Sequence, residues 1–205
     1  MIRSWTELKN NGEEDLGVEY VSSFALLGID KEGLLSTDEK LEVLIARNAW
    51  QKELIWNRFS MDQLGMSISQ PDKVRRSSQT ISVGNTGNWS TKNYLPMGCL
   101  KNKETDSILF WQIEQNGSWY WEISDQDGHM YLQLSGPTEH QSHWWKNLKP
   151  GDTFASVPVS VGSACGDVEE AAGELTKYRR AIRRKNEDNE KLPVIFNDYM
   201  NCLWG

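Results

Sequence analysis

Short runs of apolar residues, separated by turn residues, fill most of the chain between positions 18 and 161. Residues 40–47 largely alternate apolar and polar side chains, which is the pattern of a strand buried on one face. The expected strands are 19–29, 40–47, 53–59, 107–114, 118–124, 130–135 and 151–161. A helix through 50–56 is an alternative, and the irregular polar stretch 61–78 is expected to be a loop. The chain is therefore predicted to be mainly β, an antiparallel β-sandwich.

Two turn signals join the strands in the second half of this region. Asn116-Gly117 lies between the aromatic runs 107–114 and 118–124, and Asn-Gly in this setting is the strongest short signal for a hairpin. The two runs are therefore predicted to pair with each other. Asp127-Gly128 predicts a second turn, which leads into the strand at 130–135.

After Gly166 the apolar spacing changes to that of a helix. Asp167 can cap the first turn, with Glu170 three residues later as its reciprocal partner. The apolar stripe consists of Val168, Ala171, Leu175, Tyr178 and Ile182. Basic residues between 179 and 185 complement the helix dipole. We interpret them as a solvated helix end, and an anion or partner site is the alternative.

The last apolar run, at 192–196, follows a charged connector at 185–191. A near-continuous run of this kind is expected of a strand buried on both faces of a parallel sheet. Such a strand needs parallel neighbours, and the sequence ends at Gly205 without them. We therefore expect the first strand of a second, missing domain and a truncated chain. The polar residues 1–14 lead into a strand with no preceding partner strand, so the beginning is also expected to be incomplete.

Composition narrows the class of protein. A net charge of -7 and a pI near 5.1 disfavour nucleic acid as the main partner, because phosphate binding needs clustered basic charge. No apolar run approaches the roughly 20 residues of a membrane span, and no apolar signal segment opens the chain. We therefore expect a cytoplasmic protein. Cys99, Cys165 and Cys202 are widely spaced, which fits reduced thiols better than disulfides or a zinc site.

Ten tryptophans in 205 residues exceed the needs of an ordinary core. Large aromatic side chains can fill a β-sandwich, and flat indoles can also pack against the C–H faces of sugars. We expect Trp111, Trp119 and Trp121 to belong to the core. The polar loop 85–91, which carries Trp89, and the pair Trp144-Trp145 are candidates for binding.

Trp56 is the strongest single candidate for a sugar contact. It stands beside Asn57 and Arg58, so a stacking face adjoins hydrogen-bond donors, although an ordinary packed tryptophan is an equal alternative. A second polar and aromatic group follows the predicted strand at 192–196, where α/β barrels place their active-site residues. This group consists of Asn197, Asp198, Tyr199 and Trp204.

Catalytic and metal-binding groups are harder to assign. Glu114, Glu122, Asp125 and Asp127 could form a carboxylate pair, but we interpret the aspartates as turn residues and the glutamates as solvent-facing. His140 and His143 lack a third ligand, so we interpret them as part of a polar loop. The sequence also contains no phosphate-binding glycine loop and no dinucleotide motif. We assign no catalytic residue, no metal and no cofactor to this chain.

Several segments together resemble glycoside hydrolase family 36, the retaining α-galactosidases. They are Tyr20–Leu26, Tyr94–Leu100, Phe110–Glu114, Trp121–Asp125 and Leu192–Asn201. The resemblance implies an N-terminal β-supersandwich followed by a catalytic (β/α)₈ barrel. On this basis residues 1–164 are an incomplete supersandwich, 165–191 a linking helix with its connector, and 192–205 the beginning of a truncated barrel.

The resemblance also implies a function. The parent enzyme would hydrolyse terminal α-D-galactose from oligosaccharides such as melibiose and raffinose, and would assemble as a homo-oligomer. Trp56 and Tyr199 match family positions in the galactose pocket, although relatives often carry tryptophan at the second. Both catalytic aspartates of the family lie on later barrel strands, so the isolated chain is expected to be inactive.

Two other interpretations remain open. The chain could be a non-catalytic module that binds carbohydrate or supports oligomer assembly. It could also be a truncated product that does not fold stably, because an exposed apolar tail at 194–196 favours aggregation.

Overall fold

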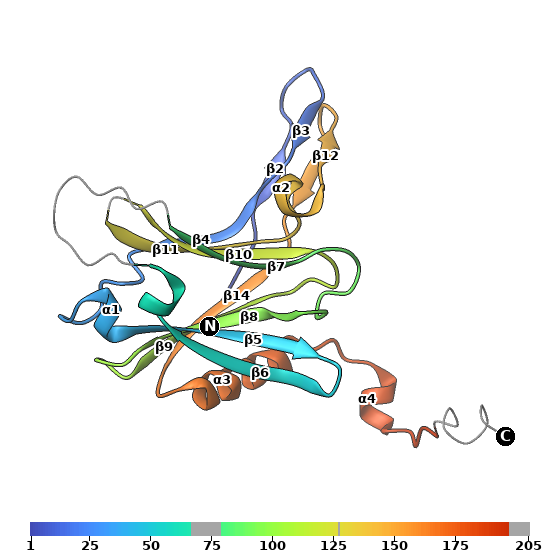
Figure 1. Cartoon of the computed structure of the whole chain (residues 1–205). Coiled ribbons are helices and arrows are strands. Elements are labelled where there is room, and N and C mark those ends of the chain that lie inside the picture. Colours follow the sequence, from blue (N-terminus) through green and yellow to red (C-terminus); the bar gives the residue numbers. More distant parts are fainter. Residues whose placement is uncertain (67–78, 127, 197–205) are drawn as a thin grey trace.

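The computed structural model describes residues 1–66, 79–126 and 128–196. Two antiparallel sheets stack on each other, as the strand pattern predicts, and one helix covers the outer face of the larger sheet (Figure 1). The larger sheet has the order β1 (Ile2–Ser4), β14 (Val159–Cys165), β9 (Ser107–Ile113), β8 (Tyr94–Asn102), β5 (Leu41–Ala49), β6 (Lys52–Ser60). The smaller sheet has the order β4 (Ser22–Leu27), β11 (His129–Ser135), β10 (Trp119–Gln126), β7 (Thr80–Asn85).

Two short strand pairs project away from the stacked sheets (Figure 1). One pair joins β2 (Glu7–Lys9) to β13 (Thr153–Ala155), and the other joins β3 (Leu16–Val18) to β12 (Lys146–Leu148). Buried Asn10 links them, because its side-chain amide donates to the carbonyl of Leu148 at 2.9 Å. The short helical segments are α1 (Thr37–Lys40), the 3₁₀ turn η1 (Asp62–Leu64), α2 (Glu139–Ser142) and α4 (Glu187–Lys191).

The main core lies between the two sheets. Trp111 of β9 and Trp121 of β10 meet edge to face, with ring centroids 5.1 Å apart. Both are fully buried, as is Trp119. The prediction that these three tryptophans fill the core is therefore confirmed.

A second apolar cluster lies on the other face of the larger sheet, under α3 (Val168–Ile182). Ala171 and Leu175 of the helix pack against Leu44 and Phe110 of the sheet. The helix prediction is confirmed, including its start: Asp167 and Glu170 form the predicted capping box.

The predicted hairpin at Asn116-Gly117 is wrong. β9 pairs with β8 and β14 in the larger sheet, whereas β10 pairs with β7 and β11 in the smaller one. The Asn-Gly segment therefore carries the chain from one layer to the other. A type I′ hairpin turn needs positive φ at both central residues, and neither Asn116 nor Gly117 has it. The second turn is confirmed, because β10 pairs with β11 and Gln126 faces His129.

Several strands differ from the sequence prediction. Residues 1–14 do have strand partners, because β1 pairs with β14 and β2 with β13. The single strand expected at 151–161 is divided between β13 and β14. Residues 52–60 form β6 and not the alternative helix. The patterns of β7 and β8 gave no strand prediction, and most of the loop expected at 61–78 lies outside the described residues.

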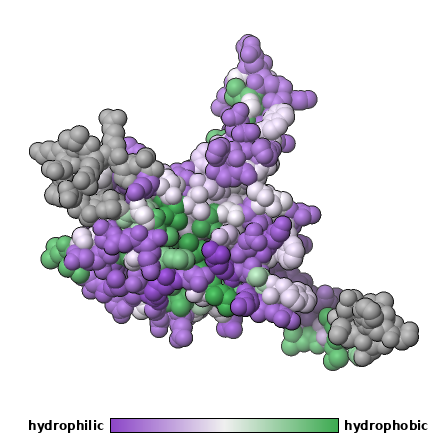
Figure 2. Space-filling model, in the orientation of Figure 1, coloured by the Kyte–Doolittle hydropathy of each residue, from purple (hydrophilic) through white to green (hydrophobic). Residues whose placement is uncertain are grey.

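The apolar run at 192–196 is neither strand nor helix in this chain. A strand buried on both faces requires neighbours, and the side chains here are exposed, with Val194 at 100% and Phe196 at 78%. Figure 2 shows hydrophobic surface at this end of the chain, in addition to patches over the body of the molecule. The division into domains at 164 and 191 stays a prediction. No helix among the described residues is long and apolar enough to cross a membrane.

Candidate functional site

Trp56 lies on β6, the edge strand of the larger sheet, on the face that α3 covers. Its partner across the strand pair is Ala46 of β5. The indole is half-buried against the cluster under α3. Trp56 is therefore a packed tryptophan that keeps part of its surface accessible at a sheet edge.

Arg58, on the same face as Trp56, is committed to other partners. Its guanidinium donates to Glu42 at 2.9 Å and to both carboxylate oxygens of Asp167 at 2.7 Å. Burial alone would raise the pKa of Asp167, but the hydrogen bonds from Arg58 and the Val168 amide lower it below its usual value. The donor role that the sequence suggested for Arg58 is thus used to fix the helix to the sheet.

The structure does not test the other predicted site residues. Asn197, Asp198, Tyr199 and Trp204 lie outside the described residues. Their proximity to Trp56 therefore stays a prediction.

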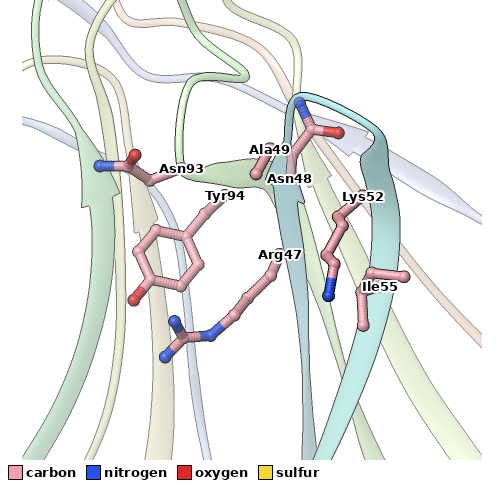
Figure 3. A pocket seen from close by; sticks show the side chains of 7 residues that line it. All are labelled: Arg47, Asn48, Ala49, Lys52, Ile55, Asn93 and Tyr94. Carbon is pink, nitrogen blue, oxygen red and sulfur yellow. The ribbon is translucent and has the colours of Figure 1, made fainter.

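A cleft of about 410 Å³ lies at the hairpin end of β5 and β6 (Figure 3). Arg47, Lys52 and Tyr94 line it, together with Asn48 and Asn93. The Arg47 guanidinium lies 5.3 Å from the centroid of the Tyr94 ring. Its lining provides donors and one aromatic face but no carboxylate, so the cleft suits binding of a polar ligand and not acid–base catalysis.

Strand geometry separates this cleft from Trp56. Neighbouring side chains on a strand point to opposite faces, so Ile55, which lines the cleft, and Trp56 face opposite ways. Trp50, at the tip between the strands, is 89% exposed, and Leu54 and Ile55 are about half exposed. We call Trp50, Leu54 and Ile55 the hairpin-end patch. The sequence gave no period-2 signal across the tip, so this patch was not predicted.

The other exposed tryptophans are scattered. Trp89 is 63% exposed in its polar loop, and the loop is anchored by the Trp119 indole, which donates to the Ser90 carbonyl at 2.7 Å. Trp145 is 64% exposed beside the projecting strands, while Trp144 contacts Phe154.

The candidate carboxylates do not form a catalytic pair. Glu114 directly follows β9 of the larger sheet and accepts hydrogen bonds from Arg3, Ser160 and Tyr178. Glu122 belongs to the smaller sheet and accepts from two tyrosines. Both are half-buried and hydrogen-bonded, so neither is a freely solvated side chain, although Glu122 does lie on the outer face of its sheet.

Among the described residues, the candidate aspartate and the candidate histidines lie in different elements. Asp125 lies within β10 and not in the turn, and Asp127 is outside the described residues. His140 lies in α2 and His143 caps it. The part of the chain that the structure describes contains no group of three or more histidine, cysteine or acidic residues placed to hold a metal.

Comparison with known proteins shows that the fold of this chain is similar to one part of a larger enzyme. No protein-family model matches the sequence, and no curated protein matches it. Among solved structures, a variant of the family 36 α-galactosidase AgaA from Geobacillus stearothermophilus, in complex with stachyose, superposes with a TM-score of 0.70. That match has 14% identity and covers 90% of this chain and 23% of that one.

Two further structures agree with it. The α-galactosidase from Lactobacillus brevis gives a TM-score of 0.64 at 14% identity, over 85% of this chain and 21% of that one. The galactosidase domain of the α-galactosidase–sucrose kinase AgaSK gives 0.61 at 19% identity, over 80% and 20%. This chain thus spans about a fifth of the length of these structures, and the similarity lies in their N-terminal region. At these identities the likeness establishes the fold.

Proposed function

We propose that this chain forms the N-terminal, non-catalytic part of a retaining α-galactosidase. The enzyme would remove terminal α-D-galactose from oligosaccharides such as melibiose and raffinose. The overlap of 90% of this chain with the stachyose complex is the observation that carries the proposal. Retaining hydrolysis needs two carboxyl groups about 5 Å apart, and Glu114 and Glu122 are engaged in separate sheets. The catalytic pair would therefore come from outside these residues.

Trp56 is the residue through which this part would serve the galactose pocket. Its support is a half-exposed indole on an edge strand, where a neighbouring segment can approach it. Asn197, Asp198, Tyr199 and Trp204 would form the opposite side of the pocket. One family 36 relative, a variant of AgaA, has been solved in complex with raffinose.

The test begins with complementary DNA downstream of the codon for Gly205. We expect a frame that continues into alternating strands and helices and supplies two candidate catalytic aspartates. The full-length product should hydrolyse a nitrophenyl α-galactoside, and Trp56→Ala should reduce kcat/KM at least about tenfold, a loss of about 1.4 kcal/mol. Trp89→Ala is the matched control and should leave kcat/KM unchanged.

Three results would contradict the proposal. They are a frame without a barrel, an inactive full-length product, and galactoside hydrolysis by the purified 205-residue chain. The last of these would require a catalytic pair among residues to which we assign none.

A second candidate function is assembly of a homo-oligomer, which the hairpin-end patch favours. Its three residues are exposed apolar side chains at one end of the larger sheet, and exposed apolar surface often marks protein interfaces. Sedimentation velocity should show a smaller assembly for Trp50→Ser with Ile55→Ser than for the unchanged chain. Leu34→Ser, at a residue that is 98% exposed elsewhere, is the control. Equal sedimentation of all three proteins would remove this candidate.

A further inference from the structure

A second cleft, of about 310 Å³, lies on the outer face of the smaller sheet. Trp119, Trp121 and Ile123 of β10 point into the core, so Tyr120 and Glu122 point outward. They form the floor with Gln133 of β11, which faces Glu122 across the strand pair. We call this the outer-sheet cleft.

Two further segments line the sides of the cleft. One is formed by Glu19 and Tyr20, before β4, and the other by α2. A backbone hydrogen bond from the Glu139 amide to the Glu19 carbonyl, at 2.9 Å, joins the two sides. Thr138 caps α2, because its hydroxyl accepts from the Gln141 amide. The cleft is therefore built from tethered parts and is not a gap beside a free loop.

Glu122 is a fixed acceptor at the base. The hydroxyls of Tyr120 and Tyr131 donate to its two carboxylate oxygens at 2.6 and 2.8 Å. Both donors are neutral, and a carboxylate has further lone pairs for other donors. Tyr20 lines the same cleft as Glu122, and burial, followed by the charge of Glu122, raises the pKa of its hydroxyl. Tyr20 as a residue remains 42% exposed.

The lining selects the class of ligand. None of its nine residues is lysine or arginine, three are glutamates and one is a histidine, so phosphates and other anions are disfavoured. None is aliphatic, so a purely apolar ligand finds no matching surface. The lining combines three carboxylate acceptors, Glu19, Glu122 and Glu139, with two amide donors, Gln133 and Gln141, beside the exposed Tyr20. A neutral ligand with many hydroxyls and one apolar C–H face matches this set.

We propose that the outer-sheet cleft is a carbohydrate-binding site for the end of a neutral oligosaccharide. Glu122 and the glutamine amides would bind hydroxyls, and the Tyr20 ring would pack against the sugar. The site lies on the opposite outer layer from Trp56, which faces α3 beyond the larger sheet. It is therefore separate from the galactose pocket of the proposed function and does not depend on it.

The experiment is a titration of the ¹⁵N-labelled whole chain with raffinose, stachyose, maltotetraose and cellotetraose, followed by amide shifts. At least one probe should shift the amides of Tyr20, Tyr120, Gln133 and Gln141. Tyr20→Ala, at an exposed side chain, and Glu122→Gln should each weaken that binding about tenfold or more. Glu13→Gln, in an exposed segment, is the control and should leave the dissociation constant unchanged.

The outcomes separate the two sites. Shifts confined to the surroundings of Trp56, and lost in Trp56→Ala, would support the galactose pocket and overturn the outer-sheet cleft. Absence of shifts in the cleft with all four probes would also overturn it. So would binding of spermidine in the cleft without any of the sugars, with a steep loss at higher salt, because that marks a cation site.

Discussion

At the scale of single residues, Gly98 shows how closely the core is packed. A Cβ atom there would come within 2.5 Å of the indole of Trp111, which is fully buried and cannot move aside. Gly98→Ala should therefore lower the free energy of unfolding by about 1–3 kcal/mol. Urea denaturation measures this loss. Gly17→Ala, where an added Cβ meets nothing within 4 Å, is the control and should change stability by less than about 0.5 kcal/mol.

Glu114 predicts a dependence of stability on pH. Burial alone would raise its pKa, but hydrogen bonds from Tyr178, Arg3 and Ser160 outweigh burial and lower the pKa below the ordinary 4.5. Stability from a lowered carboxyl pKa is fully present above the unfolded value and is lost as pH falls through the folded value. The chain should therefore lose stability below about pH 4.5.

Glu114→Gln tests this dependence. The substitution should cost about 1–3 kcal/mol at pH 7, because buried Ser160 and partly buried Tyr178 lose a charged acceptor, and much less near pH 3. Urea denaturation at about pH 7, 4 and 3 measures both effects. If the difference in unfolding free energy between Glu114→Gln and the unchanged chain were the same at every pH, the role of Glu114 would be contradicted.

The sequence identified residues by chemical type more readily than by surroundings. It placed Trp111, Trp119 and Trp121 in the core because each stands in a run of apolar and β-branched neighbours. It could not show that Arg58 is bound by Glu42 and Asp167, because these partners come from distant segments. A polar side chain next to a tryptophan in the sequence can bind a ligand only when it does not already form hydrogen bonds or ion pairs with residues from distant segments.

At the scale of elements, the beginning of α3 is held by two sets of contacts. Asp167 accepts from the helix amides, and Arg58 of β6 binds its carboxylate. Asp167→Ala should lower stability by about 0.5–2 kcal/mol through the lost cap. A double-mutant cycle with Arg58→Ala should give a coupling of about 0.2–1 kcal/mol, since both side chains are well exposed. Ala172→Ser, on the exposed face, serves as control, and zero coupling would show that the ion pair adds nothing.

Local patterns predicted the helix and several strands but not which strands pair. The Asn-Gly hairpin failed although its local signal is strong. Ile108 and Phe110 of β9 pack under α3, while Trp111 and Ile113 face the other sheet. Because β9 is buried on both faces, it must lie in the middle of the sheet that α3 covers. This requirement outweighed the local preference of Asn116-Gly117 for a hairpin turn. Pairing is decided by contacts between distant residues, which a short window does not contain.

At the scale of the whole molecule, the exposed run at 194–196 is an aggregation risk. Val194 and Ile195 are 100% and 84% exposed, and apolar segments of this kind tend to associate. Replacing Val194, Ile195 and Phe196 by serine should lower light scattering at high protein concentration without changing the unfolding midpoint. Leu34→Ser, a single exposed apolar residue elsewhere, should have little effect on scattering. Unchanged scattering in the triple variant would contradict the prediction.

The binding surfaces depend on the assembled molecule even more than the strands do. The outer-sheet cleft combines residues before β4, two central strands and α2, so its parts come from widely separated positions. The sequence contained every one of its residues but no pattern that joined them. The exposure of Trp50 could likewise not be predicted from the sequence, because its position at a hairpin tip depends on the pairing of β5 with β6.

The pairing of β1 with β14 has a consequence for synthesis. Ile2 lies opposite Val161, so β1 leaves the ribosome long before β14 and must wait for it before it can join its sheet. Until then β9 also lacks a neighbour, because β14 lies between it and β1. Sheets completed by such distant contacts form slowly and leave apolar strands open for longer. The growing chain should therefore depend on chaperones until residue 165 has emerged.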